Sequence, residues 1–188
     1  TKQALENAIA SVSATGGSTN AALHMPAIAA DFGLDLTLDD YARVVDRTPL
    51  IGDMRPGGRY AASDMYEAGG VALVMRELLK RDLLDGTQRT VDGRTIAKIA
   101  AEVVETPGQQ VVHPIETPIK ETGGQAILRG SLAPDGSIVK LAGHERRHHR
   151  GPARVFDSEV ACFAAVRERA IKAGDVVVIR YEGPKGGP

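Results

Sequence analysis

The chain has 188 residues and a formal net charge of −1, with 43% hydrophobic and 25% charged residues. This composition is ordinary for a globular protein with a hydrophobic core, and the length allows one large domain or two small ones. Because the sequence has no basic arm beyond one local cluster and no apolar run long enough to cross a bilayer, we expect neither nucleic-acid nor membrane partners. The single cysteine, Cys162, excludes a disulfide framework and fits a reducing cytoplasm.

Two helices are predicted at the start of the chain, over 4–14 and about 21–30, with a glycine-rich turn between them. Gly16 and Gly17 are typical of a helix end, and three small polar residues are available to cap the second helix: Ser18, Thr19 and Asn20. Free amides at a helix start, beside these side chains, would bind a carboxylate or phosphate. The alternative is a capped turn between two helices that binds no ligand.

Four further helices are predicted, over 39–46, 63–68, 71–81 and 96–104. A capping box at Thr37 starts the first of them, and Thr48-Pro49 stops it. Leu50-Ile51 then forms a short buried strand. The glycine loop that follows is flanked by Arg55 and Arg59, which either hold a carboxylate or phosphate or are simply solvated.

The pattern changes after the helix that ends near 104. Residues 111–120 form an extended, proline-spaced connector, which predicts a domain boundary. Strands over 126–132 and 137–141, joined by a turn at 133–136, predict a β-hairpin. The basic cluster His144–Arg150 contains three histidines, and its charge favours a solvated loop over a metal site.

The last segments predict a strand over 153–156, a helix from Glu159 to about Lys172 capped by Ser158, and a strand over 176–179 buried on both faces. The final strand leads into a Gly/Pro loop with four candidate ligand-binding residues: Arg180, Tyr181, Glu182 and Lys185. Such loops place reactive groups on a rigid support. The alternative is a tight turn in which Arg180 and Glu182 form a surface pair.

The chain does not begin with methionine, and its last residue lies within that loop. We therefore expect an internal piece of a longer protein.

Several segments together resemble the dihydroxy-acid dehydratase and phosphogluconate dehydratase family, and the dihydroxy-acid dehydratases are the most similar members. The segments occur in the family's order over nearly the whole chain: 14–24, 69–71, 90–95, 123–124 with 128–136, 153–156 and 174–188. The most specific are Gly174-Asp-Val-Val-Val-Ile-Arg-Tyr-Glu-Gly-Pro-Lys-Gly-Gly-Pro188 and Leu132-Ala-Pro-Asp-Gly136.

The resemblance implies a hydro-lyase that removes water from a 2,3-dihydroxy acid and releases a 2-keto acid, as in branched-chain amino acid biosynthesis. In this family an iron–sulfur cluster acts as Lewis acid on the departing hydroxyl, Mg²⁺ orients the carboxylate end, and a serine alkoxide takes the C2 proton. A metal makes hydroxide a better leaving group and acidifies the proton beside the bound carboxylate.

The family's cluster cysteines, Mg²⁺ ligands and basic serine match no position of this chain. The resemblance therefore implies no catalytic and no metal-binding residue here, and we expect the chain alone to be inactive. It implies substrate contacts from two segments, Ser18–Asn20 and the loop with Arg180, Tyr181, Glu182 and Lys185, facing one cleft. Cys162 has no partner cysteine, so the iron–sulfur cluster and Mg²⁺ of the full-length protein would be bound by residues outside this chain.

The fold implied is α/β: residues 1–113 would be the C-terminal part of a layered α/β domain, and 114–188 the first part of a β-barrel-like domain. For the full-length protein we expect a cytoplasmic homodimer or higher homo-oligomer with a small-molecule substrate. Three alternatives stay open: a dehydratase of sugar acids from the same family, a small binding module for a phosphorylated ligand, and a structural segment without a ligand. No complete nucleotide-binding glycine motif supports the binding module.

Overall fold

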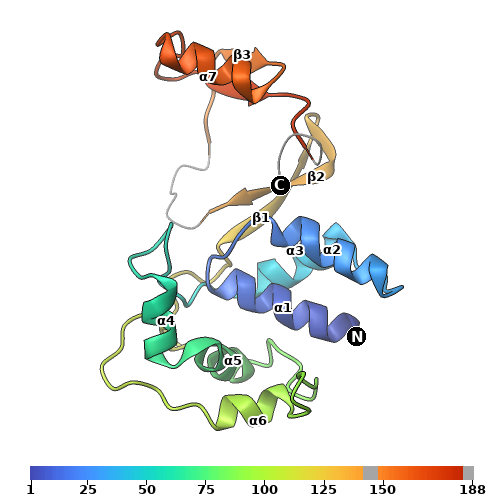
Figure 1. Cartoon of the computed structure of the whole chain (residues 1–188), viewed down its shortest axis with the longest axis vertical. Helices are drawn as coiled ribbons and strands as arrows, with labels where there is room; N and C mark the ends of the chain where they lie inside the picture. Colours follow the sequence, from blue (N-terminus) through green and yellow to red (C-terminus); the bar gives the residue numbers. More distant parts are fainter. Residues whose placement is uncertain (142–147, 184–188) are drawn as a thin grey trace. The chain divides into compact units, whose positions relative to one another are not determined.

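The computed structural model describes residues 1–141 and 148–183. Helices and two small sheets make up this part of the chain, which confirms the mixed α/β class (Figure 1). The residues group into two compact units, Thr1–His144 and Glu145–Pro188, which are described separately. The predicted domain division after residue 113 and the barrel-like second domain stay predictions.

The first unit contains six of the seven predicted helices. They are α1 (Lys2–Ala14), α2 (Ala21–Asp31), α3 (Leu38–Arg47), α4 (Ala62–Ala68), α5 (Gly70–Leu79) and α6 (Ile96–Ala101). Helix α1 is central, because it packs against α2, α3 and α5 (Figure 1). The core between these helices includes Ile9, Tyr41, Val44, Leu73 and Leu78, all almost completely buried.

Helix α3 begins with the predicted capping box. The Thr37 hydroxyl accepts a hydrogen bond from the Asp40 amide at 3.2 Å, and the Asp40 carboxylate accepts one from the Thr37 amide at 3.0 Å. A hydrogen bond from Lys2, with further ones from Thr37 and Arg43, holds the pKa of Asp40 well below its usual range. The start of α3 is therefore held in place by local sequence and by the first turn of α1.

Replacing Thr37 by alanine is expected to lower the free energy of unfolding by about 1 kcal/mol, because the Asp40 amide at the helix start loses its partner. Chemical denaturation of the purified protein measures this change. Thr37→Ser keeps the hydroxyl and is the matched control, expected to stay close to the parent protein. Equal losses for both variants would show that the Thr37 methyl group, and not the cap, carries the effect.

Helix α6 is shorter than predicted and ends at Ala101 instead of 104. The chain leaves the helical path because Thr106 is bound to the end of α4. Its amide donates to the Ala68 carbonyl at 3.1 Å, and its hydroxyl donates to the Glu67 carbonyl at 2.5 Å.

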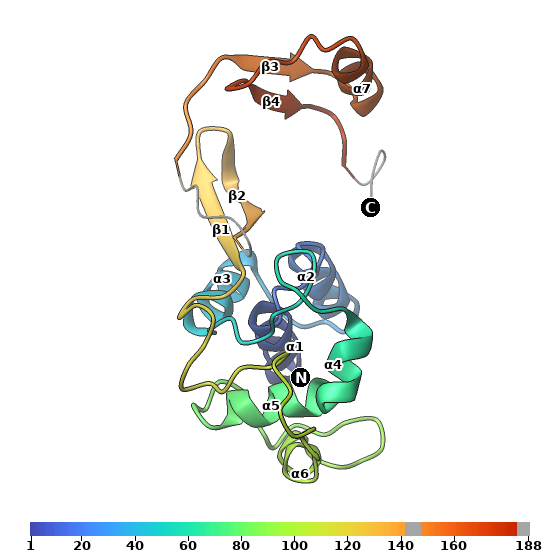
Figure 2. The same ribbon diagram turned by 90° about the vertical axis from the view of Figure 1, so that its left-hand side faces the viewer.

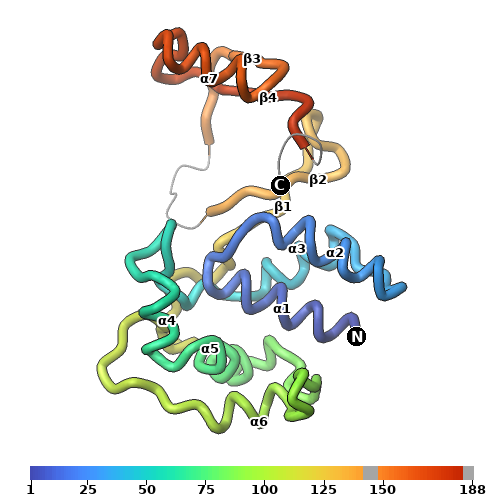
Figure 3. The backbone as a smooth tube through the Cα atoms, in the orientation of Figure 1, coloured from blue at the N-terminus to red at the C-terminus, as the bar shows by residue number. Residues whose placement is uncertain are grey.

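After α6 the chain runs along the unit without regular structure, as the tube in Figure 3 shows. Leu50 and Gly52 form isolated antiparallel bridges with Lys120 and Val112, respectively. The predicted strand at Leu50-Ile51 is thus reduced to single bridges, although both residues are buried as expected. Its partners come from this irregular segment, whose prolines cannot donate the hydrogen bonds of a continuous ladder.

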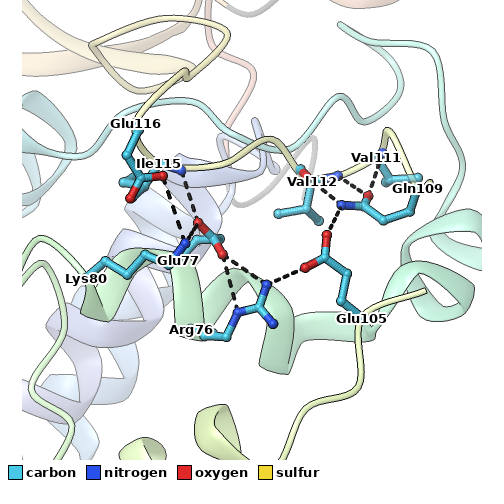
Figure 4. Close-up of polar contacts among 9 residues, drawn as sticks. All are labelled: Arg76, Glu77, Lys80, Glu105, Gln109, Val111, Val112, Ile115 and Glu116. Atoms are coloured by element: carbon cyan, nitrogen blue, oxygen red, sulfur yellow. Dashed lines mark hydrogen bonds and ion pairs between the residues drawn. The ribbon is translucent and has the colours of Figure 1, made fainter. Parts of the chain in front are cut away.

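The buried carboxylate of Glu77 on α5 binds the irregular segment that follows α6 (Figure 4). It accepts hydrogen bonds from the Ile115 amide at 3.1 Å, from Lys80 at 2.7 Å and from Arg76 at 3.1 Å, and its side chain is only 4% exposed. Burial by itself raises the pKa of Glu77, but these three donors together outweigh it, and the pKa lies below its usual value. Glu77 is therefore ionised and fully paired at neutral pH.

A second set of contacts continues from Arg76 (Figure 4). Arg76 also pairs with Glu105, which accepts a hydrogen bond from the Gln109 amide group at 2.8 Å. The Gln109 carbonyl oxygen in turn accepts from the backbone amides of Val111 and Val112 at 2.8 and 2.9 Å. Polar side chains thus supply the partners that a regular strand would otherwise provide for residues 105–115.

The predicted hairpin is present as β1 (Gln125–Gly130) and β2 (Ala133–Lys140), which pair antiparallel (Figure 2). Its turn is at 131–132, so the prediction of a turn at 133–136 is wrong. Gly130 pairs with Ala133, and the register shifts between Leu128 and Gly130. The Pro-Asp-Gly segment is absorbed as a bulge in β2, where Gly136 takes the left-handed φ of 107° that favours glycine.

The second unit contains β3 (Ala153–Phe156), α7 (Glu159–Arg167) and β4 (Val176–Ile179), with β3 and β4 parallel (Figure 2). The Ser158 hydroxyl accepts from the Ala161 amide at 3.1 Å, which confirms the predicted cap of α7. The helix ends at Arg167, before the predicted Lys172. Arg169 closes it in a left-handed conformation, φ 54°, and the Ala170 amide donates to the Ala165 carbonyl.

Strand β4 is not buried on both faces, as its apolar sequence predicted. Its residues alternate between intermediate and exposed, and Val177 and Ile179 are each 42% exposed. In the described part of this unit, β4 pairs with β3, and α7 contacts β3. A unit of this size has too few elements to cover both faces of a parallel sheet.

Candidate functional site

The turn between α1 and α2 begins as the glycines predict. The Gly17 amide donates to the Val12 carbonyl at 2.9 Å, and Gly16 takes a left-handed φ of 62°. A side chain at Gly17 would place its Cβ 2.9 Å from Val12, so α1 is closed by two residues that favour glycine for different reasons.

The second half of the turn differs from the prediction, because none of the three polar side chains caps α2. Asn20 occupies the cap position with helical dihedral angles, φ −59° and ψ −22°, and makes no side-chain cap hydrogen bond. The Ser18 hydroxyl instead accepts from the Asn20 amide, at 3.2 Å. The amides of Ala21 and Ala22 donate to the carbonyls of Ser18 and Thr19, at 3.2 and 3.1 Å. The amides that were expected to be free therefore donate hydrogen bonds within a tight helical turn.

Two other amides remain available for a ligand. Within the described ranges, the backbone N–H groups of Ser18 and Thr19 have no hydrogen-bond partner in the protein. Ser18 is exposed and Thr19 is intermediate. The turn thus offers its donors one step earlier in the chain than the capping pattern indicated.

Distant segments hold the base of this turn. The Ala14 carbonyl accepts from the amides of Ile51 and Gly52 at 2.8 and 2.9 Å, and the Ser13 carbonyl accepts from Gly124 at 3.4 Å. A Cβ at Gly52 would lie 3.1 Å from the Thr15 Cα, so this approach is close. Hydrogen bonds to distant backbone segments therefore hold the start of the turn in place, and ligand-binding loops are commonly positioned by such a scaffold.

Arg180 of the second unit follows β4, and its amide donates to the Phe156 carbonyl at 2.8 Å. Its guanidinium group pairs with Asp157, at 2.7 Å from Nε and 2.6 Å from Nη2, and lies 4.9 Å from the centre of the Tyr181 ring. The hydrogen bond with Asp157 raises the pKa of Arg180. Arg180 is thus fixed and charged, and it keeps N–H groups that this pair does not use.

Glu182 has a different role from the surface pair considered for it. Its carboxylate accepts a hydrogen bond from the Glu159 amide at 2.7 Å, at the first residue of α7. Glu182 therefore caps α7 beside Ser158, and the alternative of an Arg180–Glu182 pair is wrong. Lys185 and the end of the loop lie outside the described residues, and a common cleft with the Ser18–Asn20 turn stays a prediction.

The two arginines that flank the glycine loop serve the loop itself. Arg59 pairs with Asp53, and Arg55 Nε donates to the Arg59 carbonyl at 3.0 Å. Burial raises the pKa of Asp53, but hydrogen bonds from Arg59 outweigh this and leave the pKa below its usual value. The sequence pattern indicated ligand-binding or solvated arginines, and nothing in that pattern identified Asp53 as the partner of Arg59.

The described residues do not provide a metal-binding site, because no group of three or more His, Cys, Asp or Glu side chains is close enough together. Cys162 is buried in α7. His149 has its ring Nε2 3.0 Å from the Gly174 carbonyl, whereas His144 lies outside the described ranges. These donors do not fit an iron–sulfur cluster, which needs several thiolates, or an oxygen-bound Mg²⁺.

Among the described residues, no helix combines the length and the apolarity that crossing a membrane requires.

The sequence matches two family descriptions: dihydroxy-acid/6-phosphogluconate dehydratase N-terminal over residues 1–99, and the corresponding C-terminal description over residues 110–188. The whole chain is 53% identical to a dihydroxy-acid dehydratase of Koribacter versatilis, covering 33% of that protein. It is 55% identical to one of Roseiflexus castenholzii, covering 34%. A Thermus thermophilus dihydroxy-acid dehydratase is 51% identical and is also covered to 34%.

The chain therefore spans about a third of the length of the curated relatives that it matches. Both family descriptions match in the expected order, and together they extend over nearly all of its residues. This chain belongs to the dihydroxy-acid/6-phosphogluconate dehydratase family.

Proposed function

We propose that this chain is part of a hydro-lyase that removes water from a 2,3-dihydroxy carboxylic acid and releases a 2-keto acid. The observation that carries the proposal is identity of 53–55% over all 188 residues to proteins named dihydroxy-acid dehydratase. The family description also names 6-phosphogluconate, so a sugar acid is the second candidate substrate.

In this proposal the chain's own contribution is substrate binding. The backbone amides of Ser18 and Thr19 would bind an anionic group of the substrate, because a carboxylate can accept hydrogen bonds from adjacent N–H groups. The Asn20 side chain, exposed and not used as a cap, lies next to them.

The loop after β4 is the second proposed binding segment. Arg180 is charged and fixed by Asp157, and its unused N–H groups suit a carboxylate or hydroxyl oxygen. Tyr181 is 78% exposed beside it. We assign Glu182 to the loop's support through its hydrogen bond to Glu159, and Lys185 to the substrate side by resemblance alone.

The metal chemistry is proposed to come from other parts of the protein. The described residues do not fit an iron–sulfur cluster or Mg²⁺, so the ligands of both would be residues that the relatives carry outside the matched third. When bound, these groups would stabilise the leaving hydroxide and the substrate carboxylate. We further propose a cytoplasmic homodimer or higher homo-oligomer.

The intact protein, isolated anaerobically, is expected to convert 2,3-dihydroxyisovalerate to its 2-keto acid. A keto-acid assay measures the reaction, and 6-phosphogluconate serves as the competing substrate. A higher kcat/KM for 6-phosphogluconate than for 2,3-dihydroxyisovalerate would show that the substrate is the sugar acid and not the branched-chain acid. No turnover of either substrate by cluster-loaded protein would contradict the proposed activity.

A further inference from the structure

A buried glutamine at the start of β1 connects the proposed substrate turn to α3. Gln125 is 2% exposed. Its side-chain carbonyl oxygen accepts a hydrogen bond from the Tyr41 hydroxyl at 2.6 Å, and its amide nitrogen donates to the Gly17 carbonyl at 3.0 Å. Three segments that are far apart in the sequence thus meet through one side chain.

The direction of these hydrogen bonds is determined by chemistry. The Gly17 carbonyl can only accept, so the atom of Gln125 that faces it must be the amide nitrogen. The Tyr41 hydroxyl then faces the side-chain oxygen and must donate to it. A flipped amide would place two acceptor oxygens 3.0 Å apart, at the position of the present bond to Gly17. The arrangement therefore has one stable orientation.

Tyr41 supports Gln125 from the inside of the molecule. Its side chain is fully buried in α3, and burial raises the pKa of its hydroxyl to about 12. The hydroxyl therefore keeps its proton over the whole physiological pH range and remains a donor. Gln125 consequently cannot rotate without leaving a buried polar group unsatisfied.

The consequence for the turn follows from the planar peptide bond. In a trans peptide the C=O and N–H groups point in opposite directions. Because Gln125 holds the Gly17 carbonyl toward the buried side, the Ser18 N–H points away from it, toward the exposed side of the turn. This amide is one of the two that the turn offers to a ligand.

We propose that Gln125, supported by Tyr41, is a positioning residue that orients the Gly17–Ser18 peptide so that the Ser18 amide faces the substrate's anionic group. The inference rests on the proposed function, since it requires substrate at this turn. Gln125 itself does not touch the substrate, and its effect passes through the Gly17 carbonyl.

The test uses the intact, cofactor-loaded protein with Gln125→Met, which keeps the side chain's approximate volume and removes both hydrogen bonds. We expect KM for the dihydroxy acid to rise about tenfold, equivalent to about 1.4 kcal/mol, with a smaller change in kcat. The melting temperature should also fall, because the Tyr41 hydroxyl loses its partner.

The double variant Tyr41→Phe/Gln125→Met separates positioning from stability. It removes the buried hydroxyl, so the melting temperature should recover while KM stays high. Recovery of KM together with the melting temperature would show a merely structural role and overturn the inference. Tyr41→Phe alone is expected to raise KM less than Gln125→Met, since Gln125 can still donate to Gly17.

Ser18→Pro distinguishes a failure of the inference from a failure of the proposed site, because proline removes the Ser18 N–H itself. A raised KM for Ser18→Pro with an unchanged KM for Gln125→Met would overturn the positioning role and leave the substrate turn in place. An unchanged KM for both variants would overturn the substrate turn, and the positioning role with it.

Discussion

Glu77→Ala is expected to lower the free energy of unfolding by about 3 kcal/mol at neutral pH, because it removes the acceptor of a buried amide and of two cations. The Ile115 amide donates to this carboxylate from a buried residue and would be left unsatisfied. Lys80 and Arg76 lose the same partner, but they are partly exposed and can turn to water. Most of the loss should therefore come from the amide and from the cavity.

Chemical denaturation measures this effect, and Glu116→Ala is the matched control. Glu116 lies 3.9 Å from the same Lys80, but its side chain is 61% exposed. Exposed ion pairs contribute little, so the control should change stability by less than about 0.5 kcal/mol. Equal losses for the two variants would show that burial of Glu77 does not matter.

The loss of stability in Glu77→Ala is also expected to depend on pH. The pKa of Glu77 in the folded protein is lower than its ordinary value of 4.5. The stability that the ionised Glu77 carboxylate contributes is therefore fully present above the pKa of Glu77 in the unfolded chain. It is lost as the pH falls through the pKa of Glu77 in the folded protein. The difference in unfolding free energy between the parent protein and Glu77→Ala should be largest near neutral pH and shrink in acid. A difference that grew on acidification would contradict this assignment.

Gly123→Ala is expected to destabilise the protein by about 3 kcal/mol through overpacking. A Cβ at this position would lie 2.0 Å from the Ser13 hydroxyl oxygen, with the carbonyls of Val45 and Thr48 at 3.1 and 3.2 Å. Ser13 is completely buried on α1, so it has no open space into which it can move. The backbone at residue 123 can approach α1 this closely only with glycine.

The Ser13 hydroxyl makes the prediction specific, because within the described residues it has no hydrogen-bond partner. Ser13→Ala should thus be neutral or slightly stabilising, and Ser13→Ala/Gly123→Ala should recover about half of the loss, since the two carbonyl contacts remain. Gly130→Ala is the control, because its Cβ would meet no atom within 4 Å. A double variant as unstable as Gly123→Ala would place the clash elsewhere.

Local sequence determined the helices of this protein and the way most of them begin. The capping box of Thr37 and the cap at Ser158 involve residues three positions apart, and the apolar spacing of α1 and α5 places one face toward the core. The motifs that carry the family resemblance are equally local, which is why the sequence alone is enough to indicate the family. Such features need only neighbouring residues, and the sequence displays those directly.

Tertiary structure decided how these elements meet and which polar groups are used. The Tyr41–Gln125 and Gln125–Gly17 hydrogen bonds join residues 84 and 108 positions apart. The clash at Gly123 depends on α1, which is distant in the sequence but adjacent in the fold. The exposure of β4 likewise depends on which elements cover it. Long-range contacts of this kind leave no periodic pattern in the sequence, because each depends on where two distant backbones pack.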